Sequence, residues 1–135
     1  MGKLKLIDPD QLHSHETVDD EQVGRIMRKM KDTGVFHPPL LVDDRTKVVL
    51  DGHHRLMASK RLGCKRIPCY CVDYLGDDSI VLESWRPDVH LTKPQVLEMG
   101  LSGTVFPLKT TRHIYVIPDS IKATPLDELS ETARG

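Results

Sequence analysis

Residues 48–62, VVLDGHHRLMASKRL, constrain the fold of this chain more than any other stretch. A short apolar run leads into Asp51 and Gly52, and a helix-forming segment follows that Gly63 closes. An apolar run, a glycine turn and a helical pattern in direct succession predict a buried strand that passes straight into a helix. The turn at Asp51 and Gly52 is therefore expected to be held by the strand on one side and by the helix on the other.

The DGHHR motif (residues 51–55) at this turn has the properties of an anion-binding site. The amides of a helix's first turn have no acceptor within the helix, and together with the helix dipole they favour a bound anion. Gly52 allows a ligand to approach the backbone closely, and Arg55 can bind two phosphate oxygens at once. Asp51 is unusual here, because a carboxylate repels phosphate unless a metal or a proton intervenes. We interpret the motif as a nucleotide-phosphate site.

Each residue of the motif also has a purely structural explanation. Asp51 is a common type of helix cap, Gly52 suits a turn, and His53 and His54 could simply be solvated. Two adjacent histidines nevertheless add little to a helix, because their helix propensity is middling. The five residues together are harder to explain as structure alone, and we favour a functional site.

The hydrophobic pattern of residues 1–75 predicts a mixed α+β layer. The order is strand, helix, strand, strand, helix, strand, and the elements are expected at residues 3–7, 17–33, 40–42, 47–50, 54–62 and 67–73. Asp19 or Thr17 can cap the first helix, and Gly34 ends it. The third and fourth elements should form a hairpin, and the Met-rich face of the first helix should lie in the core.

Residues 76–78, GDD, mark the clearest internal boundary, so we divide the chain into a core of residues 1–75 and a C-terminal extension of residues 76–135. The extension should contain a strand at 79–83, a helix that Thr92 caps and Gly100 ends, a polar loop at 107–113, a strand at 114–117 and a short helix opened by Thr124 and Pro125. We expect this extension to be a small α/β unit.

Composition limits the partners and the compartment. The formal net charge of -1 over 135 residues argues against nucleic acid or an anionic membrane as a partner. No apolar run reaches the length of a membrane span and the N-terminus has no signal-peptide core, so we expect a cytoplasmic protein. The three cysteines form no Cys-x-x-Cys pair, and Cys69 and Cys71 should be small buried residues of a strand. The sequence does not indicate which oligomeric state the protein adopts.

Glu16, the hairpin and the run LDGHHRLMASKRLG at residues 50–63 together resemble the ParB/sulfiredoxin superfamily. That superfamily includes CTP-dependent DNA-partitioning proteins, sulfiredoxins and small-molecule kinases. Three more features resemble its free L-serine kinase branch: His15 before Glu16, the tripeptide SWR at residues 84–86, and TTRH at residues 110–113. The resemblance implies a ParB/sulfiredoxin-like mixed sheet with packed helices, and a kinase that converts L-serine to O-phospho-L-serine.

The resemblance also implies a role for each candidate residue. Glu16 would accept the proton of the serine hydroxyl, and Asp51 would assist by binding Mg²⁺ or by orienting that hydroxyl. The donor, ATP or ADP, would be held by Gly52, His53, His54 and Arg55. Thr110, Thr111, Arg112 and His113 would hold the carboxylate or the phosphate of the amino acid, and Trp85 would form one wall of the pocket.

Other interpretations stay open at this point. Glu16 could simply interact with the dipole at the start of the first helix, Trp85 could pack in the core, and Arg112 could pair with a surface carboxylate. A ParB-like nucleotide-binding regulator that contacts DNA is the main alternative function, although residues after 73 show no helix-turn-helix pattern. Sulfiredoxin-type reductase chemistry needs a cysteine inside the motif, where this chain has His53 and His54.

Overall fold

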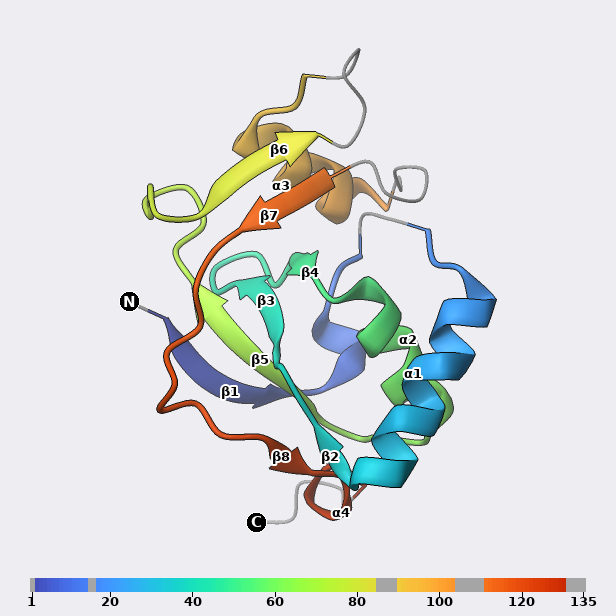
Figure 1. Cartoon of the computed structure of the whole chain (residues 1–135). Coiled ribbons are helices and arrows are strands. Elements are labelled where there is room, and N and C mark those ends of the chain that lie inside the picture. The colour runs from blue at the N-terminus through green and yellow to red at the C-terminus, as the bar shows by residue number, and fades with distance from the viewer. Residues whose placement is uncertain (1, 15–16, 85–89, 104–110, 131–135) are drawn as a thin grey trace.

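A four-stranded mixed sheet lies at the centre of the structure, in the strand order β1-β5-β3-β4 (Figure 1). The structure is a computed structural model that describes residues 2–14, 17–84, 90–103 and 111–130. The strands are β1 (Lys3–Ile7), β5 (Ile67–Val72), β3 (Leu40–Asp43) and β4 (Val49–Asp51). Strand β5 runs antiparallel to β1 and parallel to β3, and β3 and β4 form the predicted antiparallel hairpin.

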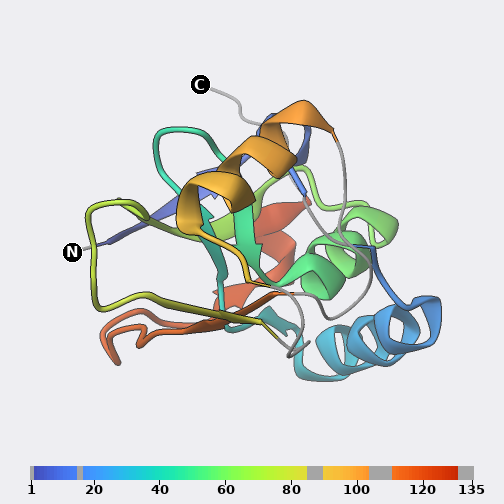
Figure 2. The same cartoon turned by 90° about the horizontal axis from the view of Figure 1, so that it is seen from above.

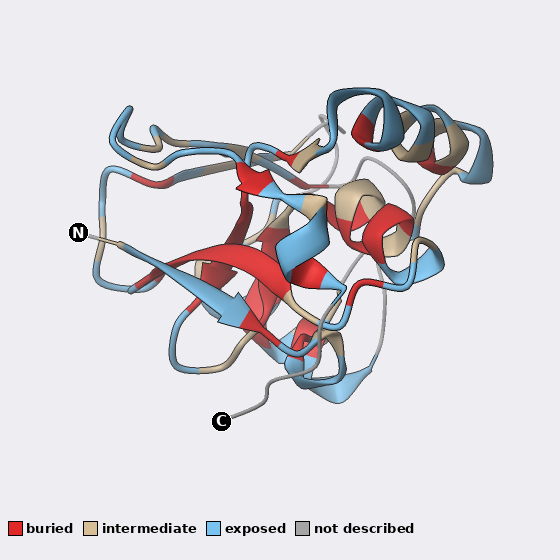
Figure 3. Ribbon diagram, turned by 90° about the horizontal axis from the view of Figure 1, so that it is seen from below, coloured by how far each residue is buried: buried red, intermediate tan, exposed pale blue. Residues whose placement is uncertain are grey.

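Both faces of this sheet are buried. Neighbouring residues of a strand point to opposite faces, and in the central strands both sets of residues lie in a hydrophobic cluster. Leu40 and Val42 of β3 belong to one hydrophobic cluster, and Leu41 belongs to the other. Strand β5 divides its side chains in the same way, so that Cys69 lies in the first cluster and Tyr70 in the second. Figure 3 shows the resulting band of buried residues along the central strands, while the edge strand β1 is largely exposed.

Three helices cover the first face of the sheet. They are α1 (Asp20–Thr33), α2 (His53–Arg61) and the short α4 (Leu126–Leu129). As predicted, α1 is capped by Asp19, ends at Gly34 in the left-handed conformation and buries Val23 and Met30 in the core. A two-stranded ribbon, β2 (Val35–Phe36) with β8 (Thr124–Pro125), holds α4 near the end of α1.

Another set of elements covers the second face. Strands β6 (Val81–Ser84) and β7 (Thr111–Ile114) form an antiparallel pair, and α3 (Lys93–Ser102) begins with the predicted capping box of Thr92 and Gln95. Ile80, Val96 and Leu97 pack with side chains of the sheet in the second cluster. Figure 2 shows α3 apart from α1 and α2, so the helices enclose the sheet from separate sides.

Three details of the extension differ from the sequence-based prediction. Helix α3 continues through Gly100 to Gly103, because Gly100 is a contact point with Val48 and not a cap. The predicted strand at 114–117 is wrong: β7 begins at Thr111, inside the predicted polar loop, and ends at Ile114, since its polar side chains hide the alternating pattern. Thr124 and Pro125 form strand β8 beside β2 before the last helix begins. A short helix 9–11, labelled η1 (Pro9–Gln11), was not predicted at all.

Replacing Gly100 by alanine should destabilise the fold. A Cβ at this position would lie 2.7 Å from Cγ1 of Val48, a buried residue of the second cluster. We expect the overpacking to lower the free energy of unfolding by about 1 to 3 kcal/mol, measured by urea denaturation.

Gly24→Ala is the matched control, because Gly24 lies inside α1 and a Cβ there meets no atom within 4 Å among the described residues. Here only helix propensity changes, and the free energy of unfolding should rise by about 0.5 to 1 kcal/mol. Equal effects of the two substitutions would contradict the close contact between α3 and Val48.

Candidate functional site

The DGHHR motif lies at the junction between β4 and α2, as the sequence predicts. Gly52 is the N-cap of α2 and has a φ of 100°, in the left-handed region that favours glycine. A Cβ on Gly52 would lie 2.5 Å from Cδ2 of Leu40 and 2.9 Å from Nη2 of Arg55. Both the backbone conformation and the available space therefore require glycine at the start of α2.

The Arg55 guanidinium folds back towards this glycine. Its Nη2 donates a long hydrogen bond of 3.4 Å to the carbonyl of Pro39. Its Nε is buried and has no hydrogen-bond partner among the residues that the structure describes. Leaving a buried charged donor unsatisfied is costly, so Arg55 is suited to receive an anionic ligand at the N-terminus of α2.

Asp51, the first residue of the motif, is held by a tyrosine of the C-terminal extension. The Tyr115 hydroxyl donates to Oδ2 of Asp51 at 2.5 Å. Burial raises the pKa of Tyr115, the charge of Asp51 and this hydrogen bond add to the rise, and Arg55 opposes it. The phenol therefore stays protonated and acts as a donor to the carboxylate.

His113 of β7, two residues before Tyr115, also approaches the motif. Its Nε2 is 2.9 Å from the Tyr74 hydroxyl, and the two rings meet edge to face with centroids 5.4 Å apart. Burial lowers the pKa of His113 to about 4, against the opposing effects of Asp51 and of a hydrogen bond to the Leu50 backbone. The imidazole is therefore neutral at pH 7 and cannot supply a positive charge to a substrate.

The chain on either side of residues 15–16 is bonded to the elements that form the motif. The backbone of His13 forms a parallel bridge to Val48, with hydrogen bonds to Lys47 and Val49 that extend the sheet beyond β4. The amide of Asp19 donates to Nε2 of His54 at 3.0 Å, so the start of α1 is tied to the first turn of α2.

The structure places the predicted site residues in three groups. Asp51, Gly52, His53, His54 and Arg55 are contiguous, and His113 is brought close to Asp51 by the fold. Thr111 is buried at the start of β7. Arg112 is exposed, and its Nη1 lies 3.8 Å from Oε2 of Glu83 in β6. Glu16, Trp85 and Thr110 lie outside the described residues. The roles assigned to all of these residues remain predictions.

Two tyrosines were missed by sequence reasoning. The Tyr115 hydroxyl is hydrogen-bonded to Asp51, and the Tyr74 hydroxyl to His113. Lys93 Nζ also lies 5.0 Å from the centroid of the Tyr74 ring. For Tyr115 a signal existed, because alternation along a strand puts residues 113 and 115 on one face. For Tyr74 none existed, since its contact with His113 spans 39 positions in the sequence.

Cysteine chemistry is disfavoured by the structure. All three cysteines are buried, and burial raises the pKa of each thiol above its ordinary value. Reactive cysteines are instead exposed and have a lowered pKa. The described residues also contain no group of three His, Cys, Asp or Glu side chains placed to hold a metal ion, and none of the helices they form is long and apolar enough to cross a membrane.

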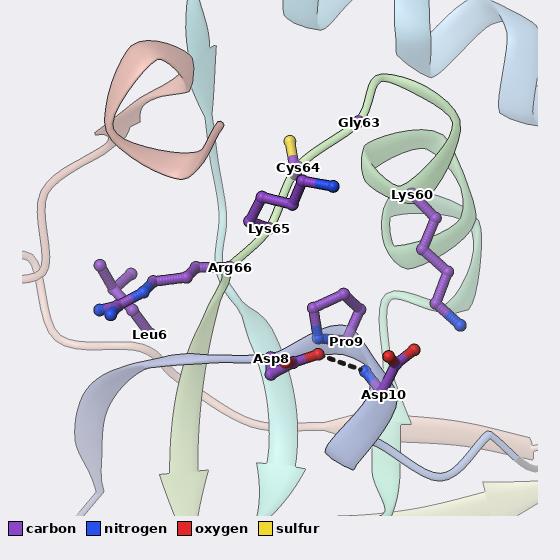
Figure 4. A pocket seen from close by; sticks show the side chains of 9 residues that line it. All are labelled: Leu6, Asp8, Pro9, Asp10, Lys60, Gly63, Cys64, Lys65 and Arg66. Atoms are coloured by element: carbon purple, nitrogen blue, oxygen red, sulfur yellow. Dashed lines mark hydrogen bonds between the residues drawn. The ribbon is translucent and has the colours of Figure 1, made fainter. Parts of the chain in front are cut away.

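Two cavities differ in their relation to the motif. One of about 620 Å³ opens at the far end of α2 (Figure 4). It is lined by Leu6, Asp8, Pro9, Asp10, Lys60, Gly63, Cys64, Lys65 and Arg66. The other, of about 350 Å³, lies between α1 and β2, and Arg55 contributes to its lining beside mainly apolar side chains such as Ile26, Met30 and Pro38. Only the second cavity adjoins the DGHHR motif.

The mixed sheet and the glycine turn into α2 define an α+β domain of the ParB/sulfiredoxin type. Residues 2–83 match the model of the ParB N-terminal domain, and the chain belongs to that family.

Curated relatives extend the comparison. The chain is 35% identical over 88 residues to the ATP-dependent L-serine kinase of Staphylothermus marinus, a match that covers 62% of this chain and 34% of the relative. It is 33% identical over 97 residues to the ATP-dependent L-serine kinase of Desulfurococcus mucosus, covering 69% and 38%. The aligned region thus spans little more than a third of the length of these relatives.

Solved structures share the fold over nearly the whole chain. A conserved hypothetical protein from Pyrococcus furiosus superposes with a TM-score of 0.82 at 17% identity, covering 94% of this chain and 97% of the other. A free serine kinase in complex with AMP superposes with a TM-score of 0.79 at 17% identity, covering 93% of each chain. At this identity the likeness establishes the fold.

The low pKa of His113 predicts a loss of stability in mild acid. The unfolded histidine binds a proton near pH 6.5 and the folded one near pH 4, so the unfolded state is favoured as the pH falls through this window. Between pH 7 and pH 5 the free energy of unfolding should fall by about 2 kcal/mol from this group alone. His113→Gln should lack this part of the pH dependence in urea denaturation.

His90→Gln is the control, because His90 is exposed. It should keep the pH dependence of the wild type. A wild-type pH dependence in His113→Gln would show that the imidazole is not held neutral.

Proposed function

We propose that the chain is a nucleotide-dependent kinase that transfers a phosphoryl group to the hydroxyl of free L-serine and forms O-phospho-L-serine. One observation carries the proposal. A glycine turn and an arginine stand at the N-terminus of α2, as a phosphate site requires, in a chain that is 33–35% identical over 88–97 residues to proteins named L-serine kinase.

The donor nucleotide, ATP or ADP, would bind at the N-terminus of α2. The positive end of the helix dipole, the close approach that Gly52 permits and the Arg55 guanidinium all favour phosphate there. The cavity beside Arg55 supports this assignment, because an apolar slot next to a phosphate site suits the nucleoside part of the same ligand. His53 and His54 complete the predicted donor site.

The acceptor serine would meet a general base at Glu16. His13 and Asp19, three residues before and after it in the sequence, are bonded to the strand and the helix that flank the motif. Asp51 would assist, either by orienting the serine hydroxyl or by binding Mg²⁺. We further propose that residues 76–135 complete the serine pocket, with Trp85, Thr110, Thr111, Arg112 and His113 as the predicted contacts.

Phosphoryl transfer implies Mg²⁺, and Asp51 could supply one of the carboxylate ligands for this ion. Mg²⁺ in kinases is commonly held by one or two carboxylates together with the substrate phosphates, so the lack of a larger ligand cluster among the described residues is compatible with it. The ion would neutralise charge on the transferred phosphoryl group. Among the residues that this chain offers, Asp51 would hold it, and its Oδ2 already accepts a hydrogen bond from Tyr115.

The proposal is tested by incubating the protein with L-serine, Mg²⁺ and either ATP, ADP or CTP, and by measuring O-phospho-L-serine by mass spectrometry. We expect product with ATP or ADP. If nucleotide binds but no donor yields product, the chain acts instead as a nucleotide-binding switch of the ParB-like kind.

Glu16→Gln should lower kcat by about two to four orders of magnitude, because the amide cannot accept the proton of the serine hydroxyl. The measurement is the steady-state rate of O-phospho-L-serine formation. Glu21→Gln is the matched control on the exposed surface of α1, where the carboxylate is 82% exposed. Equal rates for the wild type and Glu16→Gln would remove the general-base assignment.

Arg55→Ala should weaken nucleotide binding by about tenfold or more, because a charge-assisted hydrogen bond to phosphate is lost. Isothermal titration calorimetry with ADP measures the effect. Arg25→Ala, at an exposed arginine of α1 that pairs with Glu21, should bind ADP as the wild type does. An unchanged affinity of Arg55→Ala would place the phosphates elsewhere.

A further inference from the structure

The Tyr115 hydroxyl is hydrogen-bonded to the negative charge of the DGHHR motif. It donates to Asp51 Oδ2 at 2.5 Å, while the positive charge of Arg55 lowers the pKa of the same hydroxyl against the stronger effect of burial. In the described part of the chain, Arg55 and Asp51 form no ion pair with each other, and the Arg55 Nε has no partner. The Asp51 carboxylate is therefore bonded to a neutral phenol and not to the guanidinium of its own motif.

A direct pair between Asp51 and Arg55 would disable both groups for the reaction proposed above. The attraction between opposite charges is strong where water is partly excluded, and an arginine fork matches a carboxylate as well as it matches a phosphate. Arg55 would then spend its donors on Asp51 instead of on the donor nucleotide. Asp51 would likewise lose acceptor capacity that the serine hydroxyl or a metal ion needs.

Tyr115 is well placed to prevent this contact. It follows β7, and its neighbours Ile114 and Val116 are 43% and 87% exposed while Tyr115 itself packs against the second cluster. The alternating pattern thus directs one phenol from the C-terminal extension towards the motif. Its hydroxyl satisfies the carboxylate with an uncharged donor, so the charge of Arg55 is not neutralised.

We propose that Tyr115 is a positioning residue that keeps the Asp51 carboxylate and the Arg55 guanidinium apart, so that each can bind its own ligand. The inference rests on the proposed function, because it takes Arg55 to bind the donor phosphates and Asp51 to serve the acceptor. It also gives the C-terminal extension an indirect part in nucleotide binding, through a residue that acts on Asp51.

The test is a double-mutant cycle on ADP binding, measured by isothermal titration calorimetry. Tyr115→Phe keeps the ring and removes the hydroxyl, and we expect it to weaken ADP binding by about tenfold, the size of one charge-assisted hydrogen bond. In an Asp51→Asn background the same substitution should change ADP affinity by less than about twofold, because no carboxylate remains to capture Arg55.

Tyr70→Phe is the matched control. The Tyr70 hydroxyl accepts a hydrogen bond from the Gly2 amide at 3.1 Å, so the variant loses a phenol without changing the motif, and ADP affinity should stay at the wild-type value. Thermal denaturation of each variant checks that the fold is kept.

The outcomes separate the inference from the proposed function. Equal weakening by Tyr115→Phe in both backgrounds would show a merely structural role and overturn the inference, as would unchanged ADP affinity in the single variant. If the wild type binds ADP but forms no O-phospho-L-serine, the proposed function fails and the cycle still decides the role of Tyr115. If the wild type binds no nucleotide, both proposals fail.

Discussion

A single backbone conformation, the left-handed Gly52 between β4 and α2, determines the geometry of the candidate site. It turns the chain from strand β4 into helix α2 with no intervening loop, so the start of α2 lies directly at the end of the sheet. The same glycine leaves room for the Arg55 guanidinium. A helix N-terminus, an arginine and an aspartate are thereby held together within five consecutive residues.

The rest of the structure brings distant segments to this turn. The bridge between His13 and Val48 carries the N-terminal segment along β4, and His54 fixes the start of α1. The extension closes the second face of the sheet and directs Tyr115 at Asp51. Residues from both parts of the chain therefore meet at the candidate site, where the DGHHR motif contributes Asp51 and Arg55.

Sequence reasoning succeeded where local chemistry determines structure. The caps of α1 and α3 and the strand-turn-helix around Gly52 depend on neighbours within a few residues, and each was predicted. It failed where a distant partner decides. Gly100 was read as a helix end because its contact with Val48 lies elsewhere in the chain, and the link from Tyr115 to Asp51 spans 64 positions. Glu16 and Trp85, both predicted site residues, lie outside the described part of the structure.

The contact between Gly100 and Val48 also has a consequence for how such sequences diverge. Helix α3 can lie this close to the sheet only while the combined volume of the two residues stays small. A larger residue at 100 would demand a smaller one at 48, so the two positions should change together among proteins that keep this arrangement. Helix α3 thereby limits which residues can replace Val48, immediately before β4.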